Sequence, residues 1–438
     1  MKNLKRRFLN PCEEHGFFIF CNIIFKSAKY SAMRKFFVKF VGVMFAILFV
    51  IIALNVQVVS LYSLPDEAIV TYEDIEDINS QNIFGNFVSA GVTSENMSVG
   101  GEKQTKTKLS FKLFGIIPIK SVDVEITDSP KVYVGGIPLG FSLKTKGVIV
   151  VGENSVQTED GSKITIKNKP IKSGDILYKI NGTIIEDVDE IPVLLEGSSG
   201  ERTILTIIRD DKEMEIEVIP ELDVSADVYK LGLWVRDDAS GVGTLTFVNS
   251  ENNRFGALGH PITDYETGVE VPVLEGKIYK CSLIGITKGE RGKPGELKCL
   301  FMQGDNYKGT VDTNCAYGVY GDAVKLDSLI DNNLSVDIGS RMCVRPGKAK
   351  LVSSISGVRE EYDIEIIKAS YQPKSSDKSM VIRVTDSRLL ALTGGIVQGM
   401  SGSPILQDGK LVGAVTHVFL SDPTKGYGVY VDWMLENA

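Results

Sequence analysis

The sequence contains only three histidines in 438 residues: His15, His260 and His417. It has no H-E-x-x-H stretch and no pair of neighbouring histidines, so the helical zinc site of a metallopeptidase is excluded. His15 precedes a long hydrophobic run, whereas the other two follow it. A catalytic histidine in the part of the chain that follows this run must therefore be His260 or His417.

Cysteine is also sparse, with six residues and no C-x-x-C pair. Four of the cysteines lie in the C-terminal half, and their spacing matches no zinc site. Four cysteines allow three disulfide pairings, so free thiols and one or two disulfides are both compatible with the sequence. We expect no metal and no cofactor. The four residues are Cys281, Cys299, Cys315 and Cys343.

The body of the chain lacks a basic excess. The formal net charge is −8, but residues 1–39 carry nine Lys and Arg against two Glu, which leaves −15 for the rest. Binding of nucleic acid needs a basic face, so this function is excluded. A hydrophobic content of 43% and a charged content of 24% are typical of globular domains, and the length allows two or three of them.

Only one run is long and apolar enough to span a membrane. Residues 41–60 contain no charged side chain and have the length that a bilayer needs. The basic residues before this run predict that residues 1–40 are cytoplasmic and that residues 61–438 lie on the other side. A cleaved signal peptide would have a shorter apolar core and a small-residue cleavage site, so an uncleaved anchor is favoured. Met33 offers a second start, which makes the residues before it either an extension or a basic tail.

Residues 61–127 are predicted to form an acidic linker and a small β region. Six carboxylates fall within residues 66–77 among few apolar side chains, which indicates an exposed linker. Residues 106–126 alternate between apolar and polar side chains, which predicts two strands joined by a turn near Gly115.

A glycine-rich pattern marks the next region. Residues 174–182 read GDILYKING, and the stretch before them that contains Leu139, Gly140 and Phe141 is similar to a carboxylate-binding loop. With these motifs, residues 128–222 resemble a PDZ domain. The resemblance implies that a peptide terminus binds at the loop by main-chain pairing. A β module with an empty groove is the alternative.

A short loop near the C-terminus has the residue types of a serine nucleophile. Residues 399–404 read GMSGSP, and the small residues allow a tight turn that exposes Ser401. The N–H groups of Gly399 and Ser401 would then stabilise an oxyanion. Two apolar runs joined by Asp-Gly follow, which predicts a β-hairpin. An α/β-hydrolase elbow needs glycine two residues after the serine and then a helix, so that fold is excluded.

His260 is the predicted general base for Ser401. It lies in a Gly-His-Pro corner where a loop presents the imidazole, and an ordinary pKa of about 6.5 suits a base. His417 lies in an apolar strand pattern and is interpreted as a structural residue. Asp386 ends an alternating strand before the nucleophile loop and is predicted to orient the imidazole, which gives the order His–Asp–Ser. Asp264, close to His260 in sequence, is the rival acid.

These motifs together resemble the stage IV sporulation protein B peptidase family. The similarity rests on FGALGHP at residues 255–261 and on GGIVQGMSGSPI at residues 394–405, and it covers most of the chain after Met33. It implies a mainly β fold with an N-terminal transmembrane helix, an α+β PDZ domain and a chymotrypsin-like double β-barrel serine peptidase domain at residues 226–438.

The resemblance also implies catalytic residues, a function and partners. The family's triad maps onto His260, Asp386 and Ser401, which makes the chain a serine endopeptidase. The family is secreted across the forespore membrane, cleaves itself, and then cuts a membrane-bound regulator of an intramembrane protease, which triggers processing of a late sigma factor. The expected partners are this regulator, the membrane and the chain's own N-terminal region. A cut within residues 61–127 would release a soluble fragment into the forespore intermembrane space. A membrane-tethered PDZ scaffold with an inactive peptidase fold is the alternative, and the presence of all three triad residues disfavours it.

Overall fold

The computed structural model describes residues 37–45, 64–80, 88–93, 105–127, 130–165, 170–330, 335–372 and 374–438. The chain divides into two units, Met1–Tyr62 and Ser63–Ala438. In the first unit residues 37–45 are helical, and the rest of the hydrophobic run at residues 41–60 lies outside the described residues. Within the described ranges, no helix has both the length and the apolar character that crossing a bilayer requires. The membrane anchor therefore stays a prediction from sequence.

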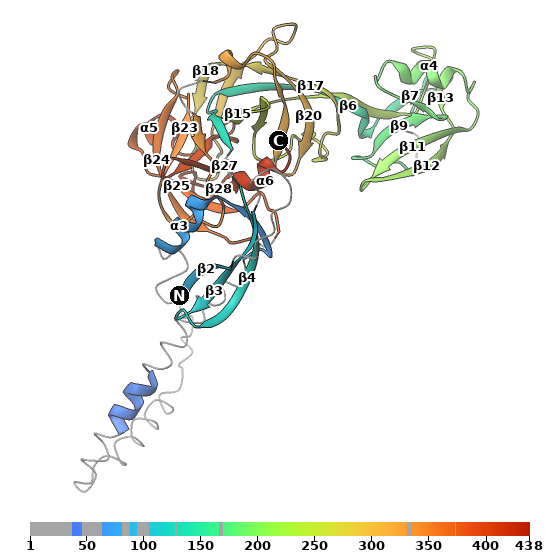
Figure 1. The fold of residues 1–438 in the computed structure, drawn as a ribbon. Helices are drawn as coiled ribbons and strands as arrows, with labels where there is room; N and C mark the ends of the chain where they lie inside the picture. The colour runs from blue at the N-terminus through green and yellow to red at the C-terminus, as the bar shows by residue number, and fades with distance from the viewer. Residues whose placement is uncertain are drawn as a thin grey trace, which may run out of the picture. The chain divides into compact units, whose positions relative to one another are not determined.

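The second unit begins with a four-stranded sheet and one helix. Their bounds are β1 Glu67–Val70, α3 Tyr72–Ser80, β2 Val88–Thr93, β3 Thr105–Leu113 and β4 Ile117–Ile126. The strand order is β1-β4-β3-β2, and β1 runs parallel to β4. Figure 1 shows β2, β3 and β4 side by side. Strands β3 and β4 pair as the predicted hairpin, with Phe114 and Gly115 in the turn at positive φ.

The acidic stretch at residues 66–77 is not an exposed linker, which corrects that prediction. It forms β1 and most of α3, and Asp74 is only 1% exposed. Thr71 and Asp74 cap the helix reciprocally. The N–H of Thr71 donates to Asp74 Oδ2 at 2.9 Å, and the N–H of Asp74 donates to Thr71 Oγ1 at 3.1 Å. The acidic composition alone does not indicate that Thr71 and Asp74 form a capping pair or that Asp74 is buried.

Six strands then close into a first barrel. Their bounds are β6 Pro138–Glu153, β15 Leu233–Asn249, β16 Arg254–Ala257, β17 Val273–Lys280, β20 Gly309–Cys315 and β21 Gly318–Ala323. They pair in the order β6-β17-β20-β21-β16-β15, and a further pairing of β15 with β6 closes the ring. Fully buried side chains such as Phe141, Phe255 and Ile278 fill its interior. Strands β5 Lys131–Val134 and β22 Ser335–Asp337 continue the sheet beyond β15.

An α+β lobe is inserted between the first two strands of this barrel. Strands β6 and β15 run beyond the ring and still pair with each other, from Val150 opposite Val235 to Glu153 opposite Leu233. The lobe has its own apolar core, separate from that of the barrel. Figure 1 shows α4 close to β9 and β11 in this lobe. Its elements are β7 Ser155–Gln157, β8 Lys163–Thr165, β9 Ile176–Ile180, β10 Thr183–Ile184, α4 Glu190–Glu196, β11 Thr203–Arg209, β12 Lys212–Val218, β13 Glu221–Asp223 and β14 Val228–Lys230.

The stretch expected to bind a peptide terminus belongs to the barrel wall, which corrects that prediction. Leu139, Gly140 and Phe141 lie in β6, where they pair with β15 on one side and with β17 on the other. Both main-chain edges are therefore occupied, and the side chains of Leu139 and Phe141 are fully buried. A strand in this position has no free edge to offer a peptide.

A second closed barrel follows at the C-terminus. Its strands are β23 Gly347–Ser353, β24 Glu360–Ala369, β25 Met380–Val384, β26 Pro404–Gln407, β27 Lys410–Val418 and β28 Lys425–Tyr430, with helices α5 Ser387–Thr393 and α6 Val431–Leu435. They close in the order β23-β24-β25-β28-β27-β26. The predicted hairpin is confirmed, because β26 and β27 join through Asp408 and Gly409, both at positive φ. The mainly β fold with two closed barrels, expected for a chymotrypsin-like peptidase, is confirmed.

Candidate active site

The predicted nucleophile loop, between α5 and β26 of the second barrel, is fastened to the first barrel. The N–H of Thr244 in β15 donates to the carbonyl of Ser401 at 2.8 Å, and its Oγ1 donates to the carbonyl of Gly399 at 2.8 Å. Thr246 Oγ1 in the same strand donates to the carbonyl of Gly402 at 2.8 Å. Ser401 is therefore held where the two barrels meet.

The glycines of this loop are required by its geometry. Gly402 has a φ of +93°, and a Cβ there would overlap the carbonyl of Thr244. Gly399 also has a φ of +93°, and a Cβ there would lie 3.0 Å from the Cβ of Leu297. Among the described residues, none accepts a hydrogen bond from the N–H of Gly399 or of Ser401. These two donors are therefore available for an oxyanion.

The two serines of the loop have different surroundings. Ser403 is fully buried, and its Oγ is without a hydrogen-bond partner among the described residues. Ser401 is partly exposed, and its Oγ donates to the carbonyl of Thr416 at 2.8 Å. A substrate can reach Ser401 but not Ser403.

His260 lies on a tight loop that leaves β16 of the first barrel and meets the second barrel. The preceding residues Leu258 and Gly259 have φ values of +69° and +71°, and a bulky residue such as leucine rarely adopts this conformation. A Cβ on Gly259 would lie 3.0 Å from Thr416 Cγ2 in β27. The ring centroids of His260 and His417 are 5.2 Å apart. His417, interpreted from sequence as a structural residue, thus lies beside the predicted base.

The tautomer of His260 follows from its backbone contact. Its Nδ1 lies 2.9 Å from the carbonyl of Pro261. A carbonyl only accepts hydrogen bonds, so Nδ1 carries the proton and Nε2 is left with a free lone pair. Burial lowers the pKa of His260 below its ordinary value, while the charge of Asp377 opposes this effect. The imidazole is therefore neutral near pH 7 and able to accept a proton.

Asp377 is the acid that faces the histidine pair, and sequence analysis did not find it. Its Oδ2 lies 3.9 Å from His417 Nδ1, and its carbonyl accepts a hydrogen bond from Thr416 Oγ1 at 3.0 Å. Burial and the neighbouring His260 lower the pKa of His417, and the charge of Asp377 opposes them. No local motif marks Asp377. The one feature of the sequence that could have indicated Asp377 is its position just before the strand that ends at Asp386.

Asp386 is placed away from this cluster. Asp377 precedes β25 and Asp386 follows it, and the five residues of that strand span roughly 17 Å at about 3.3 Å per residue. The Asp386 carboxylate caps α5, because it accepts the N–H of Arg388 at 2.8 Å and the N–H of Asp363 at 3.2 Å. The Arg388 side chain, also hydrogen-bonded to Asp386, lowers the pKa of this carboxyl to about 2. The rival Asp264 is paired with Arg236.

The described residues contain neither a metal-ligand cluster nor a disulfide. Within the described ranges, no group of three or more His, Cys, Asp or Glu side chains is arranged to hold a metal ion. The four cysteines beyond the hydrophobic run are free thiols.

The sequence of this region matches a known family. Residues 227–435 match the SpoIVB peptidase S55 family. This part of the chain belongs to that family of sporulation serine peptidases. No curated protein matches the chain.

The S55 match begins after one strand that the peptidase fold needs. The ring of the first barrel includes residues 138–145 of β6, and these lie upstream of the matched residues 227–435. The nucleophile loop, both histidines and both candidate aspartates lie inside the match. The S55 domain in this chain is therefore completed by a strand that precedes the inserted lobe.

Proposed function

We propose that the chain is a serine endopeptidase with Ser401 as nucleophile and His260 as general base. Ser401 Oγ attacks the peptide carbonyl while His260 Nε2 accepts its proton. The N–H groups of Gly399 and Ser401 stabilise the oxyanion. The protonated His260 then gives its proton to the leaving amine, and water hydrolyses the acyl-enzyme by the same relay. The hydroxyl now directed at Thr416 must rotate toward His260 first, and such contacts commonly tighten only when substrate binds.

The third member of the triad has two candidates. The resemblance to the sporulation peptidases implies Asp386, whereas the contacts of the histidine pair favour Asp377. The tautomer of His260 needs neither, because the carbonyl of Pro261 already fixes it. The remaining task of an acid is to stabilise the imidazolium that forms during attack, and this task favours the carboxylate nearest to the rings.

We further propose the role that the family resemblance implies. The enzyme is anchored by the hydrophobic run at residues 41–60, lies outside the forespore membrane and cleaves its own N-terminal region. Its protein substrate is a membrane-bound regulator of an intramembrane protease, whose cleavage leads to processing of a late sigma factor. The lobe between β6 and β15 is proposed to be PDZ-like, since β9, α4, β11 and β12 follow one another as that fold requires. The residues expected to bind a peptide, Leu139, Gly140 and Phe141, lie in the barrel strand β6, so they no longer support a peptide-binding role for the lobe.

The observation that carries the peptidase proposal is the loop around Ser401. One accessible serine lies beside two unused N–H donors, at the junction with a loop that presents a neutral histidine. A fluorophosphonate probe tests it, because only an activated serine attacks the phosphorus of the probe and expels fluoride. Wild-type protein and the Ser403→Ala control should be labelled, and Ser401→Ala should not. Labelling of Ser401→Ala at the wild-type rate would assign the nucleophile to another residue.

A further inference from the structure

The segment that follows the hydrophobic run is attached to the second barrel through its main chain. We call residues 64–80, which comprise β1 and α3, the docking segment. Arg341 Nη2 donates to the carbonyl of Glu67 at 3.2 Å, and Ser340 Oγ donates to the carbonyl of Ile69 at 3.2 Å. The carbonyls of Asp66 and Val70 accept hydrogen bonds from β4 and its end, so the carbonyls of Glu67 and Ile69 lie on the opposite edge of β1. The contacts with Arg341 and Ser340 depend on the path of the chain rather than on particular side chains of the segment.

Arg341 is fixed by the C-terminal helix. Its Nη1 lies 3.0 Å from Asp432 Oδ2 in α6, and its guanidinium centre lies 4.1 Å above the ring of Trp433. The side chains of Arg341 and Asp432 are 8% and 12% exposed. A planar guanidinium held in this way keeps its donors directed at β1, so the docking segment binds a partner that is already in place.

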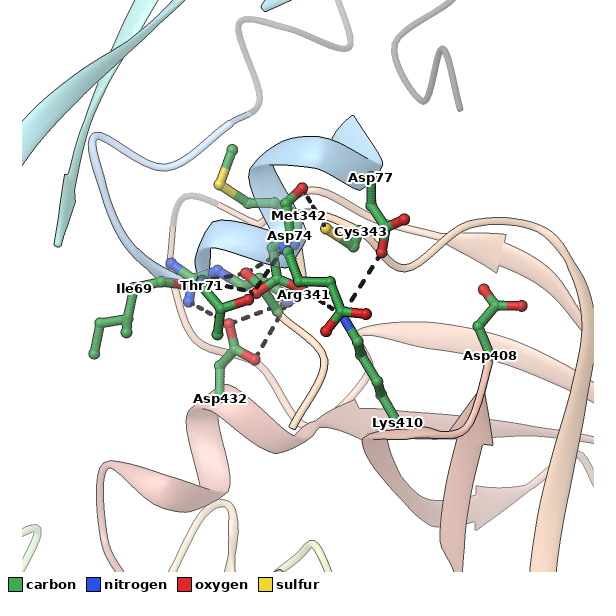
Figure 2. Close-up of polar contacts among 12 residues, drawn as sticks. Ile69, Thr71, Asp74, Asp77, Arg341, Met342, Cys343, Asp408, Lys410 and Asp432 are labelled. Carbon is green, nitrogen blue, oxygen red and sulfur yellow. Dashed lines mark hydrogen bonds and ion pairs between the residues drawn. The ribbon is translucent and has the colours of Figure 1, made fainter. Parts of the chain in front are cut away.

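Helix α3 supplies a second, ionic contact. Lys410 Nζ lies 3.1 Å from Glu73, 3.4 Å from Asp74 and 3.6 Å from Asp77, and its side chain is 14% exposed. Figure 2 shows Lys410 reaching toward α3 from the turn of the β26–β27 hairpin. The thiol of Cys343 donates to the carbonyl of Asp74 at 3.5 Å. One lysine thus pairs with all three carboxylates on this face of α3.

Three apolar side chains of the docking segment are buried as well. Leu64 is fully buried, and Val70 and Ile78 are 1% and 3% exposed. Burial of whole aliphatic side chains is worth about 1.5–3 kcal/mol each. The described apolar core of the second barrel does not include these three side chains, so attachment of the docking segment to that barrel depends on the hydrogen bonds and ion pairs.

We propose that the docking segment stays bound to the second barrel after the chain between it and the peptidase has been cut. In so far as it concerns self-cleavage, this inference rests on the proposed function. A cut at residues 81–127 then nicks the chain without freeing the enzyme from its N-terminal anchor. Only a cut before Leu64, or loss of the contacts around Arg341 and Lys410, releases it. From the sequence, a cut anywhere within residues 61–127 is expected to give a soluble fragment. Under this proposal, only a cut in the first few residues of that range does so.

A foreign protease site tests the proposal without relying on the chain's own activity. The full chain carries Ser401→Ala, an N-terminal affinity tag and the recognition sequence of a site-specific protease within residues 94–104, between β2 and β3. After cutting in detergent, the fragment that begins near β3 should remain on the affinity resin with the tagged fragment. A second protein, with the site between Ser60 and Leu64, should release it at once. Release of both fragments at the same rate would overturn the proposal.

Matched variants identify what holds the nicked chain. Lys410→Met removes the cation that α3 needs, and the cut fragment should leave the resin at least tenfold faster than in the parent. Glu76→Gln, on the exposed side of α3, should leave the rate unchanged. If Lys410→Met melts earlier than the parent before cutting, Asp74→Asn takes its place. Unchanged retention in these variants would mean that strand pairing with β4 alone holds the segment and would refute the role of the second barrel.

Discussion

The two ends of strand β25 both carry an aspartate, but their carboxylates have different surroundings. Asp377, before the strand, faces His417 and lends its charge to His260. Asp386, after the strand, accepts hydrogen bonds from the backbone and side chain of Arg388 and from the N–H of Asp363. A carboxylate whose lone pairs already bind a helix N-terminus and an arginine has little capacity left to orient an imidazole. The order of residues along the chain does not reveal which carboxylate is in this position.

Both aspartates influence catalysis only through the base, so His260→Ala should have the largest effect. Loss of the base should lower the rate of phosphonylation by a fluorophosphonate about 10⁴-fold, as in other serine triads. His417→Ala should lower it by about tenfold, because His417 lies beside the base without accepting the proton. Equal losses in the two variants, measured by labelling rates on folded protein, would reverse the choice of base.

Exchange of each aspartate for asparagine compares the two ends of β25 directly. Asp377→Asn should slow acylation and self-cleavage by about ten- to a hundredfold, because it removes a charge that stabilises the imidazolium. Asp386→Asn should cost much less, because asparagine still caps α5. A loss of about 10⁴-fold in Asp386→Asn, with Asp377→Asn near the wild-type rate, would restore Asp386 as the orienting acid.

The pH dependence of acylation sharpens the same contrast. His260 must be neutral to act as a base, and burial lowers its pKa below the ordinary value of 6.5. The rate should therefore fall on acidification with a midpoint below 6.5. Asp377→Asn should move the midpoint lower still, since the aspartate charge raises this pKa. Asp386→Asn should leave it in place, and a shift in that variant instead would place the wrong carboxylate near the ring.

The smallest expected effect is on stability at the Asp386 end. Asp386→Ala should lower the free energy of unfolding by about 1 kcal/mol through loss of the helix cap, and Asp386→Asn by clearly less. The hydrogen bond from Arg388 lowers the pKa of Asp386 to about 2, so this contribution is present above the ordinary carboxyl pKa and is lost as pH falls toward 2. Urea unfolding at pH 7 measures it. Equal stability of Asp386→Ala and wild type would show that the cap is not needed.

Local patterns were sufficient to predict the parts of the fold that depend on neighbouring residues. The hairpin through Asp408 and Gly409, the strand that holds His417 and the tight loop around Ser401 all depend on turn chemistry and short periodicity. The position of Asp377 depends instead on contacts of the residues before β25 with Thr416 and His417 in β27, which no local pattern records.

Two errors have the same physical origin. The sequence predicts Gly140 in a peptide-binding loop, but it lies in a barrel strand where a Cβ would overlap the ring of Phe301. The acidic neighbours of Asp74 predict an exposed linker, but its buried carboxylate accepts a hydrogen bond from Thr71 and pairs with Lys410. In both cases a partner distant in sequence decides the environment, and composition cannot supply that partner.

The insertion of the lobe within the first barrel has a consequence for the order of folding. Pro138 pairs with Thr244, and Glu153 pairs with Leu233, so the barrel cannot close until the whole lobe has been synthesised. The strands β9, β11 and β12 are near one another in sequence and have short loops to close, so we expect them to form first. Once the lobe is folded, the ends of β6 and β15 are held together, and most of the entropy of closing the intervening loop has already been lost. The lobe thereby acts as a nucleus for the barrel, and its deletion should slow folding of the catalytic unit even where no contact with substrate is removed.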